Sequence, residues 1–185
     1  MPGWSRLATR FRVPLGFLFA GAYLWLAHPV WPAIAFGCVF IVLGLLVRAV
    51  ASGHIRKNAQ LAVTGPYAYT RNPLYLGSIL IAVGFIIASR NWWIAGATLI
   101  MFLAIYLPVI RAEEAYLSSA FPEYADYAAH VPRLWSRFTP WKAGTDAGSP
   151  VFSGELYMRH REYNAFIGSL LMLGALILKM AWYRH

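Results

Sequence analysis

The chain has 185 residues, of which 59% are hydrophobic and only 12% are charged, whereas about 25% of residues are charged in a soluble domain. This composition predicts a membrane protein, and the length favours one domain over residues 1–185. In a membrane protein the formal charge of +9 indicates basic residues at a cytoplasmic face, and we expect no nucleic-acid partner. The single cysteine excludes an intramolecular disulfide and a cysteine-based metal centre, and we expect no metal site.

Five apolar segments predict membrane-spanning helices. In chain order they cover residues 13–27, 30–47, 74–88, 92–110 and 163–183. The first two are separated by a very short connection, as are the third and fourth, so each pair predicts a tight helical hairpin. We therefore predict an all-α, polytopic membrane helical bundle of about five transmembrane helices, with a cofactor pocket at its cytoplasmic side.

Arginine and lysine are distributed unevenly around these segments. Residues 1–12, 48–73 and 111–162 hold thirteen of the sixteen, and the opposite side receives only Arg90, Lys179 and Arg184. Because basic residues near short loops stay in the cytoplasm, the pattern predicts a cytoplasmic N-terminus. An odd number of spans then places the C-terminus on the opposite side of the membrane.

Residues 65–77, GPYAYTRNPLYLG, lead into the third apolar segment. Asn72 is a natural helix N-cap and Pro73 suits a first helical turn, so part of this motif has a sufficient structural explanation. The side chains left over are aromatic or basic: Tyr67, Tyr69, Arg71 and Tyr75. Beside a helix N-terminus they offer stacking surface for a purine and a cation–π partner for an onium group, while the backbone amides there suit an anion.

Arg111, Glu113 and Glu114 stand at the cytoplasmic end of the fourth segment. Adjacent side chains on a helix diverge by about 100°, so one carboxylate can face the bundle while the other faces solvent. Acidic groups so close to the membrane cost free energy unless they are paired or functional. Either Arg111 simply neutralises one carboxylate at the interface, or the group takes part in chemistry.

The two motifs together, GPYAYTRNPLYLG and, about forty residues later, RAEEAYLSSAFPEYADYAAHVPRL, resemble those of the isoprenylcysteine carboxyl methyltransferase family and its relatives, the phospholipid methyltransferases. The matching positions are Gly65, Tyr67, Arg71, Pro73 and Tyr75, then Glu113, Glu114, Leu117, Phe121 and Tyr124. The resemblance covers roughly residues 44–135. It implies an integral membrane enzyme that transfers a methyl group from S-adenosylmethionine bound in a cytoplasmic pocket.

The resemblance also assigns site residues by position. The cofactor-binding residues it implies are Ala59, Gln60, Leu61, Ala62, Tyr67, Asn72, Pro73, Leu74, Tyr75 and Glu113. It implies catalytic roles for Arg111 and Glu114. Arg111 would orient an acceptor carboxylate. If the acceptor is an amine, Glu114 or His54 would take its proton. Asn72 stands where the family has a histidine, so a hydrogen-bonding side chain is kept and a titratable one is lost.

The implied methyl acceptor is a lipid or lipid-linked molecule with a prenylcysteine-like carboxylate or an amine as its head group. We expect it to enter sideways from the bilayer, past the small residues Gly77 and Ser78 on a lipid-facing flank of the third segment. Two other functions stay open. One is a membrane reductase, since sterol reductases are similar to this family in their cofactor half, and the other is a non-enzymatic membrane protein whose aromatic turn only caps a helix.

Overall fold

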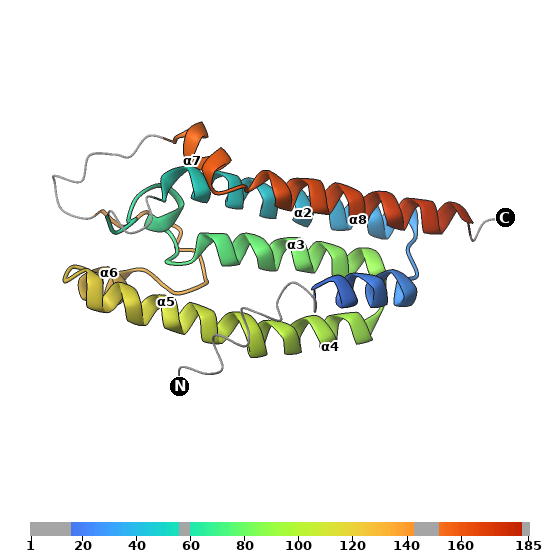
Figure 1. Cartoon of the computed structure of the whole chain (residues 1–185), viewed down its shortest axis with the longest axis horizontal. Coiled ribbons are helices and arrows are strands. Elements are labelled where there is room, and N and C mark those ends of the chain that lie inside the picture. The colour runs from blue at the N-terminus through green and yellow to red at the C-terminus, as the bar shows by residue number, and fades with distance from the viewer. Residues whose placement is uncertain (1–15, 56–59, 143–151, 183–185) are drawn as a thin grey trace.

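The computed structural model describes residues 16–55, 60–142 and 152–182, and within these ranges it contains helices and no strand. The helices, in chain order, are Gly16–Leu26, α2 Trp31–His54, η1 Gly65–Ala68, α3 Pro73–Ser89, α4 Trp92–Met101, the π turn η2 Phe102–Tyr106, α5 Leu107–Ala120, α6 Tyr124–His130, α7 Gly154–Arg159 and α8 Tyr163–Trp182. The long helices run side by side, and the short helices α6 and α7 lie near one end of the bundle (Figure 1). The predicted helical membrane bundle is confirmed.

Each of the five apolar segments contains a helix. Three helices are long and apolar enough to cross a membrane, namely α2, the continuous helix Trp92–Ala120 and α8. Gly16–Leu26 and α3 are shorter apolar helices, so the count of five crossings stays a prediction. Helix α2 continues beyond the predicted end at residue 47 to His54, because Arg48 finds a carboxylate partner inside the bundle and its charge does not end the helix.

Helices α2 and α3 pack backbone against backbone through two glycine pairs, Gly37 with Gly84 and Gly44 with Gly77. A Cβ added at Gly44 would lie 2.5 Å from the carbonyl oxygen of Gly77. Small residues permit this close approach of membrane helices. The prediction that Gly77 lies on a lipid-facing flank is therefore wrong. Gly77 faces α2, and the lack of a side chain there allows the two helices to pack closely. Ser78, one position further round the helix, lines two cavities instead.

We expect the Gly44→Ala substitution to lower the free energy of unfolding by about 1–3 kcal/mol, the usual effect of overpacking a tight contact. Gly96→Ala in α4 is the matched control, because a Cβ added there meets nothing within 4 Å. Thermal unfolding of both variants in detergent measures the difference. Equal stability of the two variants would contradict the glycine contact.

Helix α8 holds the end of the first described helix through one side chain. Lys179 Nζ donates to the carbonyl oxygens of Leu24, Trp25 and Ala27 at 2.6, 2.9 and 2.7 Å. Carbonyl groups in the last turn of a helix have no intrahelical donor, and an ammonium supplies the missing hydrogen bonds. The lysine, which sequence places in an apolar segment, therefore acts as a helix cap.

The helix Trp92–Ala120 is interrupted by the π turn Phe102–Tyr106, in which the Leu107 N–H donates to the Phe102 carbonyl. The physical cause lies just beyond this turn. Pro108 has no N–H for the carbonyl four residues earlier, and its ring would clash with that carbonyl in a regular helix. A wider turn accommodates the proline and leaves the helix continuous.

Candidate active site

The motif over residues 65–77 forms a tight turn followed by a helix start. Gly65 has a φ of 57°, a left-handed conformation that favours glycine, and Pro66 continues the short helix η1. Asn72 occupies the N-cap position of α3 and Pro73 its first turn, as predicted. The Asn72 side chain, however, makes no cap hydrogen bond, because its Nδ2 donates to the Arg133 carbonyl at 3.1 Å.

Hydrogen bonds join this turn to the segment that includes and follows α6. The Arg71 N–H donates to the Pro132 carbonyl at 2.9 Å, and the Trp141 N–H donates to the Ala68 carbonyl at 2.9 Å. The buried Tyr127 hydroxyl donates to the Tyr67 carbonyl at 2.7 Å. These bonds bring together the two motifs, which lie far apart in the sequence.

A polar cavity of about 530 Å³ lies between the two motifs, within the range of about 300–1,000 Å³ typical of small-molecule sites. It contains every described residue that the resemblance assigned to the cofactor. These are Gln60, Leu61, Ala62, Tyr67, Asn72, Pro73, Leu74, Tyr75 and Glu113. Ala59 lies outside the described residues.

The adjacent carboxylates Glu113 and Glu114 both line the polar cavity, but their surroundings differ. Glu114 accepts a hydrogen bond from Arg133 Nε at 3.0 Å and forms an ion pair with Arg133 Nη2 at 2.6 Å, and it lies 3.6 Å from the Arg71 guanidinium. The hydrogen bond to Glu114 raises the pKa of Arg133. Glu113 is exposed and has no ion-pair partner among the residues that the structure describes. The Glu113 carboxylate is therefore the one available to a ligand.

Arg111 is exposed and is absent from the lining of the polar cavity. Residues two apart on a helix point about 200° apart, so Arg111 faces away from the side on which Glu113 meets the cavity. It does not form the ion pair with either carboxylate that a purely interfacial role predicted. His54 also lies outside the lining, with its Nδ1 bonded to the Val50 carbonyl at 2.7 Å.

Two buried polar atoms at the cavity have no hydrogen-bond partner within the described part of the chain, Tyr67 Oη and Arg71 Nε. Tyr67 is only 6% exposed, and burial raises the pKa of its hydroxyl above the usual range, so the group stays protonated. An unsatisfied buried polar group costs about 1–3 kcal/mol. A bound ligand that presents acceptors to these donors removes that cost, so the residues fit a polar cofactor.

Arg48 and Glu162 form a second ion pair in the cavity wall that sequence reasoning missed. Arg48 Nε and Nη2 donate to the two Glu162 oxygens at 2.8–3.0 Å. Arg48 Nη1 donates to Ser78 Oγ at 2.6 Å and to the Leu74 carbonyl at 3.2 Å. Every N–H of the guanidinium is therefore engaged. No local sequence pattern indicates an ion pair whose two residues are 114 positions apart.

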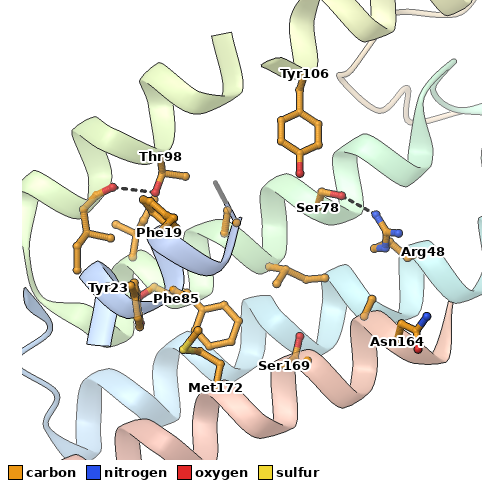
Figure 2. Close-up of a pocket in the computed structure, with 18 residues that line it drawn as sticks. Phe19, Tyr23, Arg48, Ser78, Phe85, Thr98, Tyr106, Asn164, Ser169 and Met172 are labelled. Atoms are coloured by element: carbon orange, nitrogen blue, oxygen red, sulfur yellow. Dashed lines mark hydrogen bonds between the residues drawn. The ribbon is translucent and has the colours of Figure 1, made fainter. Parts of the chain in front are cut away.

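A second cavity of about 380 Å³ lies among the helices. Figure 2 shows apolar side chains, including Phe19, Phe85 and Met172, on one side of it. Three residues, Arg48, Ser78 and Tyr106, line both this apolar cavity and the polar cavity. We call these three residues the threshold, because they form the wall that the two cavities share.

The helical membrane bundle thus holds a polar cavity beside an apolar one, and comparison with known proteins identifies the family of membrane proteins to which the chain belongs. The chain belongs to the phospholipid methyltransferase family, whose model matches residues 32–124. This range ends at Tyr124 and includes all ten of the matching positions given above.

Two curated relatives are named for metal resistance. The cobalt-zinc-cadmium resistance protein CzcN of Cupriavidus metallidurans is 30% identical over 141 residues, which cover 71% of this chain and 64% of that protein. The nickel-cobalt-cadmium resistance protein NccN of Alcaligenes xylosoxydans is 34% identical over 88 residues, which cover 48% and 41%. The chain thus spans less than two thirds of either relative. No solved structure matches it.

Proposed function

We propose that this protein transfers a methyl group from S-adenosylmethionine to a lipid or lipid-linked acceptor at the cytoplasmic face of the membrane. One observation carries the proposal. The described residues that the resemblance assigns to the cofactor line a single cavity. Among the residues that the structure describes, Glu113 has no ion-pair partner there and the buried Tyr67 hydroxyl has no hydrogen-bond partner, so both groups can bind a polar ligand.

S-Adenosylmethionine supplies an electrophilic methyl group on a positively charged sulfur. In the polar cavity, the Glu113 carboxylate binds the ammonium or the ribose hydroxyls of this cofactor, and the Tyr67 hydroxyl donates to one of its acceptors. The rings of Tyr67 and Tyr75 provide faces for the sulfonium. Because the reaction consumes a charge, alignment and exclusion of water supply most of the catalysis.

The two predicted catalytic residues stay predictions, with different support. Glu114 lines the cavity, but its oxygens are occupied by Arg133 and lie close to Arg71, which favours a role in holding the cavity wall. Arg111 lies outside the cavity lining. An acceptor carboxylate would reach Arg111 only from beyond this cavity.

The apolar cavity is the reason for proposing that the methyl acceptor is a lipid. Its lining suits an acyl or prenyl chain, since burial of each methylene contributes about 0.8 kcal/mol. A chain in this cavity places its polar head at the threshold, next to the polar cavity where the cofactor is held. A water-soluble acceptor would make no use of such a cavity.

The names of the two relatives suggest that methylation here operates during exposure to toxic metals. Among the residues that the structure describes, no group of three or more His, Cys, Asp or Glu side chains is placed to hold a metal ion. No observation therefore favours direct metal binding as a second candidate function.

Sealed membrane vesicles of defined orientation test the activity and the orientation together. We expect S-adenosylmethionine with a labelled methyl group, added outside, to label the lipid fraction only when the cytoplasmic face is outward, because the charged cofactor cannot cross the bilayer. Vesicles without the protein are the control. Label in no fraction, or only in water-soluble products, contradicts the proposal, and oxidation of a nicotinamide cofactor would favour the reductase.

A further inference from the structure

The Tyr106 side chain is fixed at the threshold between the two cavities. Its ring stacks on Phe102 with ring centroids 5.7 Å apart and forms a T-shaped pair with the Tyr75 ring, with centroids 6.0 Å apart. Figure 2 shows its hydroxyl directed towards Ser78. No described residue forms a hydrogen bond with this hydroxyl, whereas Ser78 and Arg48 bind each other.

The backbone places Tyr106 there through an unusual geometry. Tyr106 is the last residue of the π turn Phe102–Tyr106, which Pro108 imposes two residues later. Such turns are rare and occur frequently at functional sites, because they redirect a side chain without ending the helix. The contacts with Phe102 and Tyr75 then restrict the ring, so that the hydroxyl is held in place before any ligand binds.

The polar groups of the other two threshold residues, Arg48 and Ser78, already form hydrogen bonds within the protein. The Arg48 guanidinium uses its N–H groups on Glu162, Ser78 and the Leu74 carbonyl. The Ser78 hydroxyl accepts from Arg48 and donates to the Leu74 carbonyl at 3.0 Å. Of the three threshold residues, Tyr106 therefore has the hydroxyl that can bind a ligand without breaking an existing bond.

We propose that Tyr106 is a positioning residue that holds the polar head of the methyl acceptor. The acceptor chain occupies the apolar cavity, and the Tyr106 hydroxyl orients the accepting atom towards the polar cavity. This inference rests on the proposed function. A tyrosine hydroxyl donates to a carboxylate or accepts from an amine, so the role holds for either head group.

The Tyr106→Phe substitution tests this role because it removes the hydroxyl and keeps the ring contacts. The full chain is reconstituted in vesicles of phosphatidylethanolamine and phosphatidylglycerol, and labelled methyl transfer to lipid is measured. We expect kcat/KM for the lipid to fall about threefold to tenfold, the usual effect of one lost hydrogen bond, with unchanged affinity for S-adenosylhomocysteine. The matched control Tyr157→Phe, in α7 outside both cavities, should transfer like wild type. Wild-type kinetics for Tyr106→Phe overturn the inference.

A second measurement does not depend on methyl transfer. The probe is phosphatidylethanolamine with a photoreactive diazirine in the middle of one acyl chain. We expect it to crosslink to the helices around the apolar cavity, with a yield reduced about threefold to tenfold in Tyr106→Phe. If the wild-type chain transfers no methyl group, the proposed function fails, and the crosslinking yields alone decide the role of Tyr106. Equal yields in the two proteins overturn it.

Discussion

Replacing Glu113 by glutamine is expected to weaken binding of S-adenosylhomocysteine by about 1.5–3 kcal/mol, the usual contribution of a hydrogen bond to a charged group. The structure favours this residue because it lines the polar cavity and its carboxylate has no competing ion pair among the described residues. Titration calorimetry on the purified protein measures the change. Glu123→Gln is the matched control, since Glu123 is exposed and absent from the cavity lining.

The neighbouring Glu114→Gln variant should behave differently. It deprives Arg71 and Arg133 of their common partner, so we expect turnover to fall more than cofactor affinity. If Glu113→Gln binds the cofactor product as tightly as wild type, Glu113 does not hold the cofactor.

Replacing Arg48 by methionine is expected to lower the free energy of unfolding by about 3 kcal/mol, because removal of one partner leaves a carboxylate without compensation in a protein interior. The Glu162 side chain is only 12% exposed, and it joins the segment before α8 to α2. Thermal unfolding in detergent measures the loss.

The double variant Arg48→Met with Glu162→Leu distinguishes two contributions to the free energy of unfolding: the loss of the ion pair itself, and the cost of leaving the Glu162 carboxylate buried without a partner. Replacing both members of a buried ion pair by apolar residues is often close to neutral, so the double variant should regain most of the stability. A double variant no more stable than Arg48→Met would show that the pair does not account for the effect.

The helices and the aromatic turn could be predicted because their signals are local. An uninterrupted apolar run specifies a membrane helix. A turn begins where glycine precedes proline at residues 65–66, and α3 begins where Asn72 precedes Pro73. More than half of the residues that line the polar cavity lie within the two motif segments, residues 65–77 and 111–134, so the family motifs could indicate this part of the lining.

The partners of the charged residues could not be predicted. Glu114 has an arginine three positions before it, a spacing that puts the two side chains on neighbouring positions of one helix face, but the structure pairs Glu114 with Arg133 and Arg71. Arg48 and Glu162 meet only after the bundle has assembled. The partner of each carboxylate depends on which basic side chain the tertiary fold places beside it, and the local sequence does not contain this information.

The placement of Tyr106 had a partial signal. A proline at position 108 inside an apolar run indicates a disturbed helix, but it does not specify whether a kink, a break or a wider turn follows. The geometry of the helix near Pro108 decides which side chain lies at the threshold. The sequence pattern does not specify this geometry, so the apolar cavity and the threshold could not be predicted from it.

The π turn also sets the angular register of the whole helix that follows it. It holds one more residue than a regular turn, so each later residue stands about 100° from where an unbroken helix of the same sequence would put it. Straightening the turn without shortening the chain would rotate Glu113 and Glu114 away from the polar cavity. Deleting one residue within the π turn would restore that register for both carboxylates, but it would move Tyr106 and place Pro108 in a regular helix, where its ring clashes with the carbonyl four residues earlier.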